Sequence, residues 1–274
     1  MQGCSLMERP RVGAEVYRYL AGAILLFVMA GCAGLSQSRL EPMEESHSLK
    51  VLEQLRQKES IIVTLKGLFL VSISGAGIPL SQDLNGVVSY QQPDQVRLKG
   101  FIRLGVPVLD FYREGDHYEL FFPAEGRMVS GRVDGDGHVS EWDQTIMLSL
   151  RALDAVLGKV AGLGSPNVHV LKDDRYYSID QVLSSPDSAG ISGEALVRTK
   201  VDAQTLEVNS IDYFQSGDDL IVSVECEDYR AVKNKKSDAP PFVRLPFKVR
   251  ATDHRVLGGS VTLTFREFLL NAAS

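Results

Sequence analysis

The stretch that decides the fold is QVRLKGFIRLGVPVLDFYREGDHYELFFPAEGRMVSGRV, residues 95–133, in which apolar and polar side chains alternate. One parity holds Val96, Leu98, Ile102, Leu104, Val106 and Val108, and the other holds Arg97, Lys99 and Arg103. Successive side chains of a strand point to opposite faces of its sheet, so this pattern predicts a strand with one apolar and one basic face. The sheet that contains it is expected to face solvent on one side only.

Turn sequences divide the remainder of this stretch into short strands. Residues 113–116 (REGD) and 123–126 (PAEG) are turn-like and separate the strands expected at 108–112, 118–122 and 128–133. Further strands are expected at 68–73, 87–90, 168–171, 175–179, 195–200, 205–214, 220–225, 247–251 and 261–265. Turns that recur about every 8 to 12 residues indicate a large antiparallel sheet or barrel, here of about 10 to 12 strands.

Two helices are expected beside this sheet. In the first, Leu49, Leu52 and Leu55 recur at helical spacing, and Ser46 or Ser48 can cap its N-terminus. The second has its apolar face on Ile146, Leu150, Leu153, Leu157 and Val160. No linker or fixed-period repeat interrupts residues 46–274, which are therefore expected to form one α+β domain.

The N-terminal segment has the composition of a secretory signal peptide. Arg9, Arg11 and Arg18 precede an apolar run that ends at Gly31, and this run is shorter than the roughly 20 residues that span a bilayer. The next residue is Cys32, and the arrangement resembles the lipobox of bacterial lipoproteins. That resemblance implies a signal peptide at 1–31, acylation of Cys32, and a lipidated tether at 32–45. An ordinary secretory signal is the alternative, and translation starts at Met1 or Met7.

The resemblance to lipoproteins also implies a location. No acidic residue follows Cys32, because residue 33 is Ala. By analogy with enterobacterial lipoproteins, the protein is expected on the outer membrane, with its domain in the periplasm and membrane lipid as a partner through the acylated cysteine.

Composition and charge narrow the classes of partner. With 44% hydrophobic and 23% charged residues, the chain is typical of a folded domain. The formal net charge is −6, so nucleic acid is not expected as a partner, because a polyanion is bound through a basic surface. Cys226, the only cysteine beyond the expected lipidation site, cannot form an intrachain disulfide in the mature chain and is interpreted as a buried strand thiol.

The residue inventory does not assemble a catalytic or metal site. The histidines at 47, 117, 138, 169 and 254 show no i, i+4 pair, so neither zinc nor another metal is expected. The loop VDGDGHVSEWD, residues 133–143, is interpreted as a turn and not as a calcium loop, because His138 and Val139 stand where an oxygen ligand and Gly are required. Glycine-rich nucleotide motifs and the Gly-x-Ser-x-Gly elbow are missing. We therefore expect a protein that is not an enzyme and has no cofactor.

Six short motifs, in this order along the chain, resemble the LolA/LolB-like lipoprotein carriers. They are LKGLFLVSIS (65–74), PDQVRL (93–98), FFPAEGRMVSGR (121–132), VDAQTLEV (201–208), LPFKV (245–249) and VTLTFREFLLN (261–271). The resemblance implies an unclosed, strongly curved antiparallel barrel whose concave face is covered by helices and accepts acyl chains. The lipid anchor agrees better with the membrane-fixed acceptor than with the free periplasmic carrier.

A protein of this kind would accept acyl chains of a lipoprotein or another lipid and deliver lipoproteins to the outer membrane. The candidate lining residues are Leu98, Ile102, Val108, Leu120, Phe122, Ile146, Leu150 and Leu153. Periodicity does not distinguish a cavity from a core in which helix and sheet fill each other. The alternative function is a structural or assembly lipoprotein that uses the same fold as a platform for an envelope partner.

Residues 103–107 (RLGVP) give a candidate for membrane insertion. LolB-like proteins have a Pro-Leu-Gly loop whose leucine enters lipid, and Leu104-Gly105 matches the second half of that motif. Arg103 stands in place of the proline, and the alternation through Val106 also permits Leu104 to be an inward strand residue. The two interpretations of Leu104 both remain open at the level of sequence.

Overall fold

The chain folds into one antiparallel sheet and two helices in the part that the computed structural model describes, residues 40–75, 82–102, 105–132, 141–160, 163, 167–183, 195–215, 218–255 and 258–272. Residues 1–39, including Cys32, lie outside this part, as does Leu104. By their contacts, Leu40–Ser274 form one compact unit. Within the described residues, neither helix is long and apolar enough to cross a membrane.

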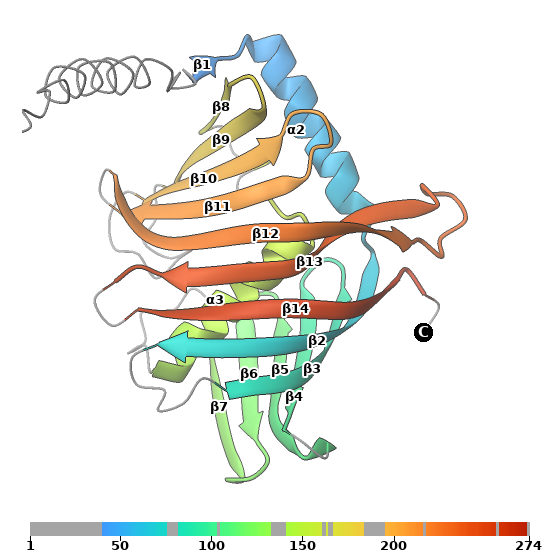
Figure 1. Cartoon of the computed structure of the whole chain (residues 1–274), viewed down its shortest axis with the longest axis vertical. Coiled ribbons are helices and arrows are strands. Elements are labelled where there is room, and N and C mark those ends of the chain that lie inside the picture. The colour runs from blue at the N-terminus through green and yellow to red at the C-terminus, as the bar shows by residue number, and fades with distance from the viewer. Residues whose placement is uncertain are drawn as a thin grey trace, which may run out of the picture. The chain divides into compact units, whose positions relative to one another are not determined.

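The described sheet has fourteen strands, in the order β1-β8-β9-β10-β11-β12-β13-β14-β2-β3-β4-β5-β6-β7 (Figure 1). The first half of the chain contributes β1 (Glu41–Pro42), α2 (Glu45–Ser60), β2 (Thr64–Gly75), β3 (Gln82–Gln91), β4 (Gln95–Phe101), β5 (Pro107–Glu114), β6 (His117–Phe122) and β7 (Arg127–Arg132). The second half contributes α3 (Glu141–Val156), β8 (Val168–Lys172), β9 (Tyr176–Leu183), β10 (Ala195–Asp202), β11 (Val208–Gln215), β12 (Asp219–Lys233), β13 (Phe242–Asp253) and β14 (Gly259–Leu270).

Two meanders make up this sheet. Strands β2 to β7 pair in chain order, as do β8 to β14, and the pairing of β14 with β2 joins the two series. The sheet does not close, because β1 and β7 are its two edges. This arrangement confirms the expected α+β fold with an unclosed, curved antiparallel sheet. The strand count exceeds the expected 10 to 12, partly because β1 has only two residues and leaves no alternation in the sequence.

Helix α3 connects the two meanders and crosses one face of the sheet, behind β12, β13 and β14 in Figure 1. All five residues of its expected apolar face, and also Leu148, Ala152, Ala155 and Val156, are buried. A helix that is apolar around most of its circumference must be covered on most sides. The sheet therefore curves around α3, and a single hydrophobic core fills the space between them.

Helix α2 packs through Val51, Leu52 and Leu55, whereas Leu49 is 60% exposed. The expected stripe of Leu49, Leu52 and Leu55 is thus wrong at its first member. The helix begins at Glu45 after Glu44, and Ser48 donates a hydrogen bond to the carbonyl of Glu44 (3.1 Å) within the first turn. The expected cap at Ser46 or Ser48 is therefore wrong, and the helix packs on the sheet through a face that includes Val51 instead of Leu49.

The alternation of residues 96–108 does not continue through one strand. Strand β4 ends at Phe101, and the chain turns back through Gly105, whose N–H donates to the carbonyl of Ile102 (3.2 Å). Gly105 has a φ of 74°, which glycine adopts without steric cost. The interpretation of this segment as one continuous strand is wrong, and Leu104, with its two interpretations, lies outside the described residues.

Candidate functional site

An apolar cavity of about 70 Å³ lies between the N-terminal half of α3 and the strands β2 to β5 and β14. We call it the α3 cavity. Its lining consists of Phe69, Val71, Ile73, Leu84, Leu98, Lys99, Gly100, Leu109, Phe111, Thr145, Ile146, Ser149 and Leu263. Apolar side chains from five strands and one helix surround it, so the space is suited to a hydrocarbon group and not to an ion.

Glycines on the inner face of the sheet create this space. Gly86 of β3 and Gly100 of β4 are cross-strand neighbours, and Gly86 also faces Phe69 of β2. A Cβ atom on Gly86 would lie 2.3 Å from Cζ of Phe69, so the ring already occupies the room above this glycine. A Cβ atom on Gly100 would meet nothing closer than Cβ of Leu109, at 3.4 Å. The row of side chains is therefore interrupted at Gly100, where the cavity lies.

On the side toward β14 the cavity is lined by Leu263 and by Phe69, whose ring packs against aromatic rings of β14 outside the lining. The centroids of Phe69 and Phe265 are 5.5 Å apart, and those of Phe265 and Phe268 are 4.4 Å apart. Aromatic pairs at such distances pack tightly and are themselves stabilising. This side of the cavity is consequently well supported, and any enlargement of the cavity has to come from the α3 side.

Helix α3 contributes Thr145, Ile146 and Ser149 to the lining. The hydroxyl of Ser149 donates to the carbonyl of Thr145 at 2.9 Å, one turn back along the helix. A hydroxyl that bonds to its own helix leaves little unsatisfied polarity in the cavity. The helix thus presents an apolar side chain and a satisfied hydroxyl to the space.

The cavity lies at the end of the sheet where the β4–β5 hairpin turns. Its lining residues Ile73, Leu84 and Leu109 are each two residues from the end of their strand on that side. Beyond them, Ile102 and Val106 are exposed large hydrophobic residues joined by a backbone hydrogen bond of 3.1 Å. Apolar side chains therefore continue from the cavity to the edge of the domain.

Two of the eight lining residues expected from the sequence, Leu98 and Ile146, do line the cavity. Leu120, Phe122, Leu150 and Leu153 are buried members of the surrounding core and lie outside the lining. Ile102 is 43% exposed past the end of β4, because the chain turns there. Val108 is half-buried at a register shift opposite Gly100 and Phe101, and this irregularity places Leu109 and Phe111 in the lining instead.

Sequence reasoning missed the whole wall formed by β2. Phe69, Val71 and Ile73 alternate within LKGLFLVSIS, a signal that was present but could not be assigned to a cavity. No local pattern reveals that Gly86 and Gly100 become neighbours, because their pairing depends on the register of β3 with β4.

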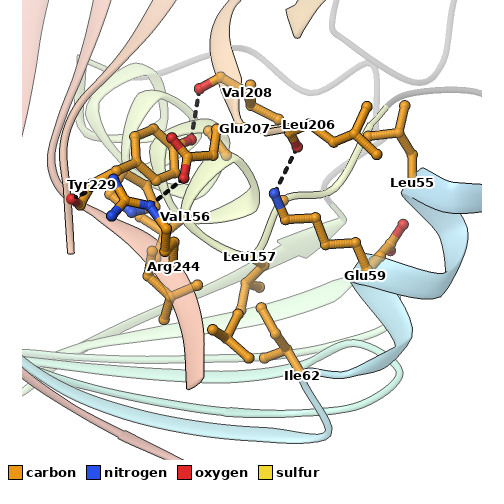
Figure 2. A pocket seen from close by; sticks show the side chains of 16 residues that line it. Leu55, Glu59, Ile62, Val156, Leu157, Leu206, Glu207, Val208, Tyr229 and Arg244 are labelled. Carbon is orange, nitrogen blue, oxygen red and sulfur yellow. Dashed lines mark hydrogen bonds and ion pairs between the residues drawn. The ribbon is translucent and has the colours of Figure 1, made fainter. Parts of the chain in front are cut away.

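The opposite end of the domain is closed by polar contacts between α2 and the β10–β11 turn. A pocket of about 30 Å³ lies between the C-terminal ends of α2 and α3, this turn and β12–β13, and Figure 2 shows the side chains that line it. Lys58 Nζ donates to the carbonyl oxygens of Leu206 (2.7 Å) and Thr205 (3.1 Å). Burial lowers the pKa of Lys58, while the carboxylate of Glu207 opposes that shift. These contacts attach α2 to the sheet and leave room for little more than one water molecule.

Two further polar pairs are drawn in Figure 2. Arg244 Nε donates to Glu207 Oε1 at 2.5 Å, and the Tyr229 hydroxyl donates to the carbonyl of Val208 at 2.6 Å. Burial raises the pKa of Tyr229 and raises that of the nearby Cys226 thiol to about 12. Cys226 is therefore a buried thiol that is little ionised near neutral pH, in agreement with its interpretation from the sequence as a buried strand thiol.

A further charged cluster surrounds Lys159, which follows α3. Its Nζ lies 2.9 Å from Asp94 Oδ1 and 3.7 Å from Asp154 Oδ1. Burial raises the pKa of Asp154, and the Lys159 ammonium counteracts this shift. No group of three or more His, Cys, Asp or Glu side chains suited to a metal ion occurs within the described residues. The cluster joins the end of α3 to the β3–β4 turn.

Comparison with solved structures shows that this architecture is the LolA-like fold. A candidate outer membrane lipoprotein-sorting protein domain from Vibrio parahaemolyticus superposes with a TM-score of 0.55 at 12% identity, over 82% of this chain and 93% of that one. A LolA superfamily protein from Nitrosomonas europaea gives a TM-score of 0.50 at 10% identity, over 81% and 94% of the two chains. A DUF1329 family protein from Desulfovibrio piger gives 0.53 at 12% identity, over 85% and 95%.

At the level of sequence, no family model matches the chain and no curated protein is similar to it. The likeness is thus one of backbone architecture.

Proposed function

We propose that this protein binds acyl chains of lipoproteins or other lipids in the α3 cavity, while anchored to the outer membrane through lipidated Cys32. The observation that carries this proposal is the apolar cavity between α3 and the sheet. A core in which the helix and the sheet filled each other would leave no such space. Burial of apolar surface supplies about 25 cal/mol per Å², so an acyl chain gains affinity with each methylene that leaves water.

The volume of the cavity sets how a chain would bind. An apolar cavity of about 150 Å³ accommodates benzene, and the α3 cavity has about half that volume. It therefore accepts only the end of an acyl chain in the conformation described. The remainder of a chain enters when the first turns of α3, which carry Thr145 and Ser149, move away from the strands. Phe69, held by its ring contact with Phe265, stays in place during this movement.

The fold supports the same function. A structure named for lipoprotein sorting and a LolA superfamily structure share the architecture, and the proposal extends that role to this chain. The protein then acts without catalysis, since cargo is bound and released but not chemically changed. Its cargo would be delivered to the outer membrane in which its own anchor lies. A structural lipoprotein of an envelope complex is the alternative that the following experiment separates.

The test is photo-cross-linking in cells with the full chain. A benzoylphenylalanine at Leu84, a half-buried residue of the cavity lining, is expected to capture palmitate-labelled lipoproteins as species heavier than the protein itself. The same group at Gln54, on the exposed side of α2, is the matched control and should capture none. Absence of lipid-bearing adducts at Leu84 would favour the structural role.

A second variant links capture to the volume of the cavity. Ser149→Leu places an apolar side chain in the space and removes a hydroxyl that only bonds to its own helix. We expect the variant to fold and to lose the adducts at Leu84, whereas Ser149→Ala, which leaves the space open, should retain them. Equal capture in both variants would show that the cavity does not hold the cargo.

A further inference from the structure

Strand β7 leaves one edge of the sheet open. It pairs with β6 alone, over all six of its residues and without a register shift. No other described strand lies on its far side (Figure 1). The N–H and carbonyl groups that point away from β6 therefore have no partner strand in the part of the chain that the structure describes. Such a row of main-chain groups is a template for one further strand.

The two edges of the sheet differ in how they are protected. The opposite edge is β1, which has only two residues, and one of them is Pro42, which has no N–H to donate. Natural sheets commonly block their edges with such short strands, with proline, with bulges or with charged side chains along the edge. Strand β7 has no proline and no bulge, and its four central residues, 128–131, are uncharged. The edge at β7 is thus the one suited to a partner.

The charges beside β7 do not favour a partner of either sign. Arg127 forms an ion pair with Glu125 at 3.0 Å, and Arg132 forms one with Asp116 at 2.5 Å. The carboxylate of Glu119 is on the exposed face of the adjacent β6. Recognition at this edge therefore depends on the main chain, which any extended peptide can match.

One row of inward side chains joins this edge to the α3 cavity. Leu98, Phe111, Leu120 and Val129 lie directly opposite one another in β4, β5, β6 and β7. The first two of them line the cavity. Neighbouring strands are about 4.8 Å apart, so β7 lies about 10 Å from Phe111 across the sheet. One ligand can therefore reach both the cavity and the edge.

An aromatic ring extends the interior toward the same edge. A Cβ atom on Gly131 would lie 2.7 Å from the hydroxyl oxygen of Tyr118 and 2.8 Å from its Cζ, so this ring covers the glycine. Phe111 stacks on the ring of Tyr118, with the centroids 6.0 Å apart. A strand added to β7 would place an inward side chain beside this ring, because Gly131 has no side chain to separate them.

The chemistry of the edge distinguishes between possible partners. Antiparallel pairing of two β7 strands over their full length would put Arg127 of each copy opposite Arg132 of the other, and like charges directly opposite each other destabilise a ladder. A lipid head group does not offer donors and acceptors that alternate at the spacing of a strand. An extended peptide does, and it binds an open edge through main-chain hydrogen bonds.

We propose that β7 binds, as an added strand, the peptide segment that follows the acylated residue of a lipoprotein whose acyl chain occupies the α3 cavity. This inference rests on the proposed function and adds a second site of different chemistry. The first turns of α3 lie against Leu98 and Phe111, so their proposed movement would open the row that connects the two sites. Main-chain hydrogen bonds would hold peptides of many sequences.

The experiment is hydrogen exchange of the full chain on vesicles, read by mass spectrometry on fragments that contain residues 127–132. Three probes are compared: palmitate, a short palmitoylated peptide of alternating threonine and serine, and the same peptide with proline at every second position. Proline cannot donate to a ladder, so the third probe keeps the acyl chain and loses the ability to form a strand. Photo-capture of each radiolabelled probe at Leu84 reports on the cavity independently.

We expect the threonine–serine peptide to slow the exchange of about half of the β7 amides, because alternate N–H groups of an antiparallel strand point to the edge. The slowing should be roughly fivefold or more, and β3, which is paired on both sides, should not change. Palmitate and the proline peptide should leave β7 unprotected. Equal protection by all three probes, or by none, would overturn the proposal.

The capture measurement separates the two sites. All three probes should be captured at Leu84 if the cavity holds their acyl chain. Capture without protection of β7 refutes the edge site and leaves the proposed function intact. Protection of β7 without capture shows that the peptide binds apart from the cavity and also refutes the proposal, whereas the absence of both refutes this inference together with the proposed function.

Discussion

The ring of Phe69 lies where a side chain on Gly86 would have to be, with Cζ 2.3 Å from the position of a Cβ atom. Phe69 in turn packs 5.5 Å, between ring centroids, from Phe265 and lines the α3 cavity. A glycine on one strand thus determines how a ring on the next strand shapes the space under α3.

Gly86→Ala is expected to lower the free energy of unfolding by about 1 to 3 kcal/mol, as overpacking of a core usually does. Because Phe69 lines the α3 cavity, displacement of its ring would alter the lining, so lipoprotein capture at Leu84 should fall as well. Urea unfolding provides the measurement. Gly100→Ala is the matched control, since its Cβ atom has 3.4 Å of clearance, and it should change stability by less than about 1 kcal/mol. Equal destabilisation by both substitutions would contradict this explanation of the cavity.

Lys58→Met removes two hydrogen bonds between α2 and the β10–β11 turn and keeps the apolar stem. The carbonyl groups of the half-buried Leu206 and the exposed Thr205 lose their donor, so we expect a loss of about 1 kcal/mol in the free energy of unfolding. Lys50→Met on the exposed side of the same helix controls for loss of charge. If the two variants have the same urea midpoint, the Lys58 contacts do not hold α2 in place.

Cys226 should resist alkylation while the protein is folded. Its pKa is raised from its ordinary value to about 12, so the thiolate fraction at pH 8 is about a thousandfold lower than that of a free thiol. Since the thiolate is the reactive form, labelling by iodoacetamide should be slow at pH 8 and should accelerate as pH rises toward the raised pKa. Urea should abolish the protection. Rapid labelling of the native protein at pH 8 would mean that the thiol is accessible.

Cys32→Ala is expected to abolish incorporation of labelled palmitate and to leave an unprocessed or soluble precursor. The reason is that a lipobox cysteine is both the site of acylation and the residue before which the signal peptide is cut. The measurement is radiolabelling followed by fractionation of membranes. Cys226→Ala, which removes a buried thiol, should still incorporate palmitate, and unchanged labelling of C32A would falsify the lipobox assignment.

The sheet could be predicted from alternation because each strand has one face in the core. Val96 and Leu98 of β4, and Leu120 and Phe122 of β6, are buried as their parity requires. The alternation of inward and outward side chains is interrupted between Phe101 and Pro107, because a turn and a register shift lie there. A change of register moves a whole set of side chains to the other face of the sheet. Neither a turn nor a register shift leaves a periodic pattern in the sequence that would predict it.

The cavity was harder to predict than the sheet for a related reason. Ile146, Leu150 and Leu153 share one helical face, yet only Ile146 reaches the cavity. The difference depends on which strands lie beneath each turn of α3, and glycines far apart in the sequence decide where space remains. Local patterns specify which side chains face inward, whereas the volume left between them depends on the packing of the whole domain.

The two-residue strand β1 has a mechanical consequence. Glu41 and Pro42 pair with Lys172 and Leu171, and the N–H of Met43 donates to the carbonyl of Val170 at 3.2 Å. Tension on the proposed tether reaches this short ladder before any other part of the described domain. Because the ladder has few hydrogen bonds, it is expected to rupture at low force. Detachment of β1 would lengthen the tether by about 15 Å before tension reaches α2, which begins at Glu45. The domain can therefore be pulled or sheared at the membrane surface while its core stays folded.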